Sequence, residues 1–72
     1  MEYEKGNTYL ITCTIPLVIR TKASDDGTYI TTYPPGHKIE CISYTTDDCG
    51  NIWIRIELGW VKATSGEEIF IQ

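Results

Sequence analysis

The amino-acid sequence predicts an all-β domain, and its composition, its length and the spacing of its turns indicate this class. Eleven Ile, ten Thr and two Val stand against only three Leu and two Ala. Branched side chains favour the pleated surface of a sheet over a helix. The 72 residues suffice for one domain. Turn signals recur at roughly 8–12-residue spacing, which is typical of a small barrel or sandwich. We expect a small barrel of five to seven short, mostly antiparallel strands, because closure removes unprotected edges.

The first strands follow a short polar start. Residues 1–7 are charged and polar, so we expect a loose tail or linker remnant there and a single domain over residues 8–72. A strand is expected over residues 8–13, and it ends before Pro16 because proline cannot donate to a ladder. Residues 17–20 form a second short run. Residues 21–28 are small, charged and glycine-containing, which indicates an irregular surface loop.

The rest of the chain alternates strands with turns. Pro35-Gly36 presets one tight turn, and polar clusters mark the others. In the clearest strand Ile39 and Cys41 are expected to face inward. The remaining strands are expected over residues 29–33, 37–44, 52–56, 60–63 and 68–72.

Charge and hydropathy exclude several classes of function. The net charge is −4, and six scattered basic residues cannot neutralise a nucleic-acid backbone. No apolar run approaches 18 residues, so we expect no membrane span. The start of the chain lacks a secretory signal pattern. Either the protein works where it is made, in the cytoplasm, or it is a module excised from an exported or phage lytic protein and acts outside the cell or in its wall.

The cysteines and the histidine do not form a recognisable chemical motif. Three cysteines, an odd number, argue against a disulfide framework. Cys13 and Cys41 fall within apolar strand patterns, and Cys49 falls within a polar turn. No Cys-x2-Cys unit is present, so we expect neither a metal nor a cofactor. A nucleophile set of Cys49, His37 and Asp48 can be written, but nothing brings the three together. We therefore expect a non-catalytic protein.

Both tryptophans lie in the stretch GNIWIRIELGW, residues 50–60. Alternation places Ile52, Ile54 and Ile56 on one face of a strand and Trp53 with Arg55 on the other. The isoleucines belong inside, so Trp53 is expected outward or at the rim. Trp53 is therefore the best single candidate for ligand binding, with Arg55 as a possible neighbour.

We expect an aromatic shelf for ligand binding between the loop 21–28 and the turn 45–51. Tyrosine suits such half-wet positions because its ring packs while its hydroxyl stays hydrated. Residues 29 and 33 are four apart and would share a strand face. The predicted shelf consists of Tyr29, Tyr33, Tyr44 and Trp53, with acids nearby at Asp25, Asp26, Asp47 and Asp48. Alternatively, these rings only cover the second face of a thin barrel. Trp60 either lines the groove or plugs the end of the barrel, and we favour the plug.

The ordered features resemble a bacterial SH3 (SH3b) domain. They are Leu-Val-Ile-Arg at 17–20, Ala-Ser at 23–24, the glycine turn and strand at 36–41, the tryptophan strand at 53–56 and Gly-Trp-Val at 59–61. The match covers residues 8–63. Two features depart from the family pattern. Residues 21–24 stand where the family commonly has glycine and proline, and residues 64–72 add a possible hairpin strand.

The resemblance implies a non-catalytic module attached to a peptidoglycan hydrolase or another wall protein, as in endolysins and autolysins. Its partner would be peptidoglycan peptide or glycan, and we expect a monomer. The alternative is a stand-alone protein–protein interaction module, a small phage or bacterial protein that uses the same groove or a sheet edge. A third option is a scaffold domain within a larger enzyme.

Overall fold

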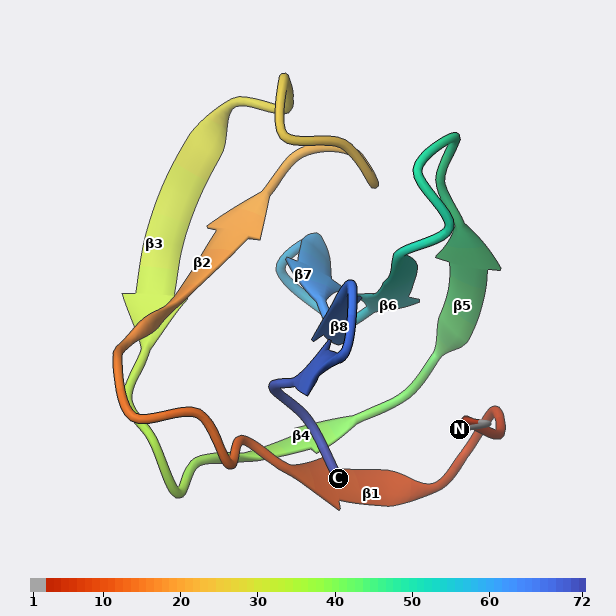
Figure 1. The fold of residues 1–72 in the computed structure, drawn as a ribbon. Helices are drawn as coiled ribbons and strands as arrows, with labels where there is room; N and C mark the ends of the chain where they lie inside the picture. Colours follow the sequence, from red (N-terminus) through yellow and green to blue (C-terminus); the bar gives the residue numbers. More distant parts are fainter. Residues whose placement is uncertain (1–2) are drawn as a thin grey trace.

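The computed structural model describes residues 3–72 and shows an all-β protein, with no helix in this range. The strands form three antiparallel sheets (Figure 1). They are short, and within residues 3–72 they number nine rather than the expected five to seven. They are β1 (Thr8–Leu10), β2 (Leu17–Arg20), β3 (Tyr29–Tyr33), β4 (Lys38–Glu40), β5 (Ser43–Thr46), β6 (Ile52–Arg55), β7 (Trp60–Lys62), β8 (Thr64–Ser65) and β9 (Glu68–Ile69).

The largest sheet has the strand order β3-β2-β7-β6-β5, and its inner face forms much of the core. Paired residues on neighbouring strands share a face, and the register puts Ile19, Val61 and Ile54 in one inner row. All three are fully buried. A two-stranded ribbon, β1 with β4, adds Ile39 to the same cluster. As predicted, Ile39 and Cys41 face inward, with 4% and 0% of their surfaces exposed.

The strand predicted over residues 37–44 is two strands, because the chain changes partners at Cys41. The Cys41 N–H donates to the Asn7 carbonyl, whereas the Ile42 N–H donates to the Arg55 carbonyl. The chain therefore leaves β1 and joins β6 within two residues. This corner adds a strand to the expected number.

The N-terminal segment is part of the folded domain, so the expected tail over residues 1–7 is wrong for residues 3–7. Tyr3 is 1% exposed, belongs to the core and donates its hydroxyl to the Ile71 carbonyl. The Gly6 N–H donates to the Cys41 carbonyl. The segment is held in the fold although most of its residues are polar, because burying the ring of Tyr3 removes a large apolar area from water. Residues 1 and 2 of the expected tail lie outside the described residues.

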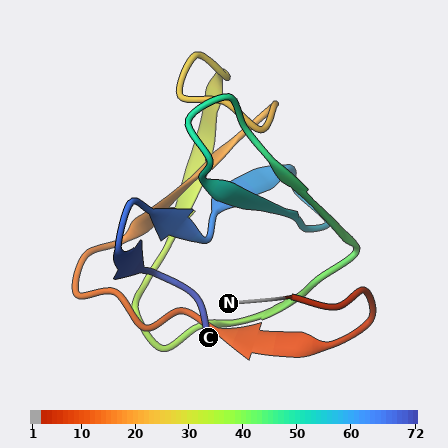
Figure 2. The same ribbon diagram turned by 45° about the vertical axis from the view of Figure 1, so that its right-hand side comes forward.

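The C-terminal segment returns to the first strand. The hairpin of β8 and β9 replaces the longer strand expected over residues 68–72. Beyond it Ile71 bridges Ile11, and the Gln72 N–H donates to the Leu10 carbonyl. The C-terminus consequently lies beside β1 in both views (Figures 1 and 2). None of the described residues forms a helix long and apolar enough to cross a membrane.

Candidate functional site

Trp53 is buried, with 1% of its surface exposed, so the expectation of an outward binding ring is wrong. Trp53 does lie on the outer face of the strand, as the alternation predicts, since Ile54 belongs to the inner cluster and Trp53 does not. In the sheet Trp53 pairs with Lys62 on one side and Thr45 on the other. The outer face is covered because the loop at residues 21–28 and the turn at residues 47–51 supply polar groups over the ring.

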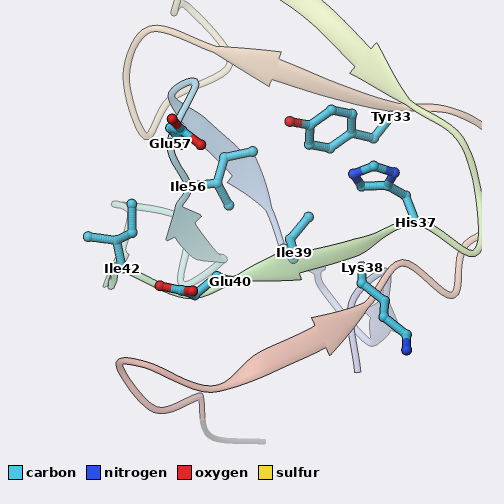
Figure 3. A pocket seen from close by; sticks show the side chains of 8 residues that line it. All are labelled: Tyr33, His37, Lys38, Ile39, Glu40, Ile42, Ile56 and Glu57. Atoms are coloured by element: carbon cyan, nitrogen blue, oxygen red, sulfur yellow. The ribbon is translucent and has the colours of Figure 1, made fainter.

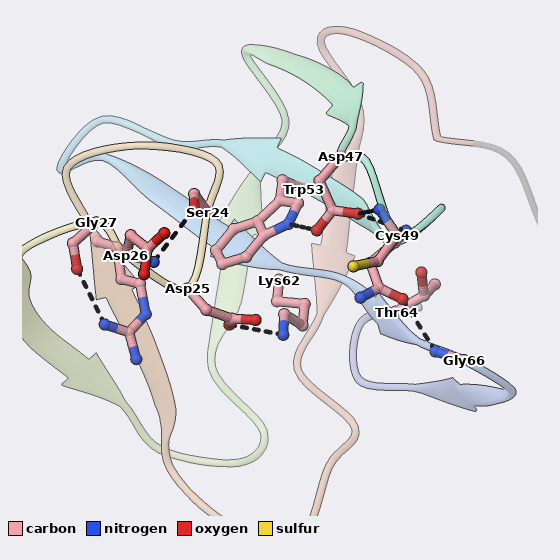
Figure 4. A network of polar contacts seen from close by, with 12 residues as sticks. Ser24, Asp25, Asp26, Gly27, Asp47, Cys49, Trp53, Lys62, Thr64 and Gly66 are labelled. Atoms are coloured by element: carbon pink, nitrogen blue, oxygen red, sulfur yellow. Dashed lines mark hydrogen bonds and ion pairs between the residues drawn. The ribbon is translucent and has the colours of Figure 1, made fainter.

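A polar network holds the indole in place (Figure 4). The Trp53 Nε1–H donates to Asp47 Oδ2 at 2.8 Å, and Lys62 Nζ lies 5.3 Å from the ring centroid. Lys62 also forms an ion pair with Asp25 at 2.7 Å, which ties the loop to the ring. A buried indole N–H needs such an acceptor, and a cation over its face is favourable. Two of the four acids expected at a ligand site therefore bind this chain's own residues.

Asp47 also organises its own turn. Its Oδ1 accepts from the N–H groups of Cys49 and Asn51, at 2.9 Å each. The hydrogen bond from Trp53 is the largest cause that lowers the pKa of Asp47, and the two backbone N–H groups and Lys62 lower it further. The other two expected acids, Asp26 and Asp48, are exposed in the loops and bind no aromatic ring there.

The expected aromatic shelf does not form, because a bulge separates its two strand tyrosines. Tyr33 pairs with Leu17, which faces the core, whereas Tyr29 pairs with Arg20 on the outer face. The register shifts between Ile19 and Arg20, so one extra residue in β3 reverses the alternation. Tyr29 is 60% exposed, and Tyr44, 47% exposed, lies on the distant strand β5.

Trp60 lies on the outer face and does not plug the core, because its neighbour Val61 occupies the inner position. It is half-buried between Arg20 and Arg55, its cross-strand partners. The Arg55 guanidinium carbon lies 5.9 Å from the Trp60 ring centroid. Trp60 and Arg55 therefore lie against each other on the outer face of the sheet.

A groove of about 430 Å³ lies elsewhere, at the end of the β5–β6 hairpin opposite its turn (Figure 3). One end holds Tyr33 and His37, whose rings stack with centroids 4.1 Å apart. Its apolar floor comes from Ile39 and Ile56. Eight residues line it: Tyr33, His37, Lys38, Ile39, Glu40, Ile42, Ile56 and Glu57.

The charge at the rim of the groove is mainly negative. Glu40 and Glu57 are exposed there, and among residues 3–72 neither forms an ion pair. The side chain of Lys38 points away from the centre of the groove (Figure 3). Carboxylates beside an apolar floor can hold an ammonium group while its carbon chain packs below.

Of the predicted site residues, only Tyr33 lines this groove. Sequence reasoning missed His37, Glu40 and Glu57 because they are separated in the chain and each looks like an ordinary exposed residue. One local signal was available: in Tyr-Pro-Pro-Gly-His the tight turn folds the chain back, which brings the rings of residues 33 and 37 together. Nothing in the sequence brings Glu57 to them before the fold is known.

A scan of protein-family models, a search of curated proteins and a search of solved structures each find no match for this chain.

Proposed function

We propose that this protein is a non-catalytic binding module with an SH3-like barrel, and that its groove holds short amine-bearing peptides of bacterial peptidoglycan. The groove supports this proposal most directly. It has an apolar floor, a stacked ring pair at one end and two rim carboxylates that form no ion pair within residues 3–72. Stem and bridge peptides carry free amines and little apolar bulk, so they suit a narrow acidic groove.

The chemistry of the lining fits recognition rather than reaction. The ammonium group of a ligand would bind Glu40 or Glu57, because charge-assisted hydrogen bonds are the strongest available to it. Its peptide groups would bond the Tyr33 hydroxyl and the His37 ring nitrogens, which are both donors and acceptors. The lining includes no Ser, Thr or Cys that could act as a nucleophile. The net charge of −4 also favours cationic over anionic ligands.

The order of elements supports the SH3-like interpretation. A long loop at residues 21–28 joins the hairpin of β2 and β3, and a second hairpin joins β5 and β6. A tight turn then leads to β7: Ile56 and Gly59 each donate a backbone N–H to the other's carbonyl. This succession accords with the SH3b resemblance of residues 8–63. The hairpin of β8 and β9 lies beyond it.

Pelleting with purified Gram-positive sacculi tests the proposal. The parent protein should move to the pellet, and Tyr33→Ala should weaken binding about tenfold or more, as truncation of an aromatic anchor does. Glu57→Gln should also weaken binding, and it should disturb the fold less than Tyr33→Ala because Glu57 is exposed. Tyr29→Ala is the matched control, since Tyr29 is exposed and outside the groove.

Two results would reject the proposal. One is a parent protein that stays wholly in the supernatant. The other is equal binding by the Tyr33→Ala and Glu57→Gln variants and the parent, with thermal melts that show both variants folded.

A further inference from the structure

Strand β5 is an edge of the five-stranded sheet, and its outer side has no neighbour among the described strands. Hydrogen bonds in an antiparallel pair alternate along each strand. The Ile52 carbonyl accepts from Ala63 and the Ile52 N–H donates to Thr64, so Ile52 points away from β5. The Asp47 N–H donates to the Asn51 carbonyl, which fixes the same alternation on β5.

This alternation identifies the free groups of the edge. Ser43 and Thr45 direct their backbone groups to β6, while Tyr44 and Thr46 direct theirs outward. Two N–H groups and two carbonyls, spaced two residues apart, therefore point away from β6, with no described strand beyond them. Such a row is a template for another strand.

Apart from its length of four residues, the β5 edge has few of the features that protect edges. Residues 42–46 (Ile-Ser-Tyr-Thr-Thr) contain no charge, proline or glycine. The opposite edge, β3, is protected by a bulge beside Arg20 and by Pro34-Pro35 at its end. Ile42 and Tyr44, 50% and 47% exposed, add apolar surface along the unprotected strand.

We propose that two copies of this chain pair through their β5 strands, antiparallel, about a twofold axis at Thr45. In this register Tyr44 of each copy faces Thr46 of the other. The outward N–H groups of each strand then lie opposite the outward carbonyls of the other strand, and four backbone hydrogen bonds form across the axis. The interface is isologous, so it closes as a dimer and does not propagate. It replaces the monomer expected from the sequence, and among the edge residues 42–46 only Ile42 also lines the proposed ligand groove.

Charge complementarity at the two ends of the paired strands favours a second copy as the occupant. The Cys41 carbonyl accepts from Gly6, so the segment with Lys5 lies on the free side where β5 begins. In the twofold register the Asp48 end of the partner strand reaches this segment. Each end of the paired strands therefore brings Asp48 of one copy near the segment that carries Lys5 in the other. Glu4 in that segment accepts a hydrogen bond from Asn7 of its own chain. The interface is small, so the dimer is weak and depends on concentration.

Sedimentation equilibrium of the full chain, from micromolar to millimolar concentration, tests the dimer. The parent should dimerise, and Thr45→Lys should remain monomeric because like charges would face each other at the axis. An equimolar mixture of Thr45→Lys and Thr45→Glu should dimerise again. Thr8→Lys, on the exposed strand β1, is the matched control and should behave as the parent. Thermal melts check that each variant is folded.

A cross-link tests the register directly. In the proposed register, Thr45 of one copy lies opposite Thr45 of the other as a non-hydrogen-bonded pair. Their Cα atoms are then about 4.5 Å apart, a separation that a disulfide can bridge. In a Cys49→Ser background, Thr45→Cys should give a covalent dimer on mild oxidation, and Thr46→Cys should give at least tenfold less. A parent that stays monomeric at millimolar concentration, a dimer insensitive to Thr45→Lys, or equal cross-linking at both positions would overturn the proposal.

Discussion

Replacing Trp53 with alanine tests whether the tryptophan is core or ligand surface. Its side chain is 1% exposed, and its N–H is bonded to Asp47 at 2.8 Å. Removing a buried tryptophan costs about 3–5 kcal/mol. A protein of 72 residues has a free energy of unfolding of about 4–11 kcal/mol in total. We therefore expect Trp53→Ala to lose a large part of its stability, with a melting temperature lower by more than about 12 °C.

Thermal and urea unfolding followed by far-UV circular dichroism measure this loss. Tyr29→Ala is the control, because its ring is 60% exposed and its removal should change the free energy of unfolding by no more than about 0.5 kcal/mol. A Trp53→Ala protein that melts within a few degrees of the parent, but no longer binds sacculi, would refute the buried role and restore Trp53 as a binding residue.

Three further substitutions test other parts of the fold. The lowered pKa of Asp47 stabilises the folded state above the unfolded value of about 3.9, and this contribution disappears as pH falls through the lowered pKa. Asp47→Asn should therefore reduce the urea midpoint at neutral pH and match the parent in strong acid; an equal deficit at both would contradict this. Gly59→Ala places a Cβ 2.5 Å from the Arg20 carbonyl oxygen and should cost about 1–3 kcal/mol in urea unfolding, whereas a neutral effect would show that the turn relaxes freely. Tyr3→Ala should cost about 3–5 kcal/mol, and a melt unchanged from the parent would return residues 3–7 to the tail.

Strand composition and inward positions could be predicted from the sequence because they depend on local periodicity. The strands over residues 17–20 and 29–33 are found where they were expected. Ile54 and Ile56 are buried, as the alternation required. These positions needed no knowledge of which segments meet. They follow from the side-chain period of two and from the preference of branched residues for sheets.

The exposure of Trp53 could not be predicted in the same way, because alternation assigns a face and says nothing of what covers it. Lys62, which pairs with Asp25, lies over the ring, and Asp47 accepts from the indole N–H. These two acids are in loops 28 and 6 residues away along the chain. The bulge beside Arg20 likewise depends on pairing between two strands, and it separates Tyr29 from Tyr33. Long-range contacts of this kind also unite Tyr33 with Glu57 in the groove.

The covered outer face also explains why the groove, and not the tryptophan, is the better candidate for a ligand site. A domain this small has little apolar surface to bury, so a buried Trp53 contributes to the fold, and Asp47 in the turn satisfies its indole N–H internally. Asp47 accepts three hydrogen bonds within the chain, and a ligand would have to break at least one to reach the indole. Glu40 and Glu57 have no ion pair among residues 3–72, and an ammonium group could bind them without such a loss. A ligand would therefore bind at the groove with a smaller loss of existing interactions than at the tryptophan.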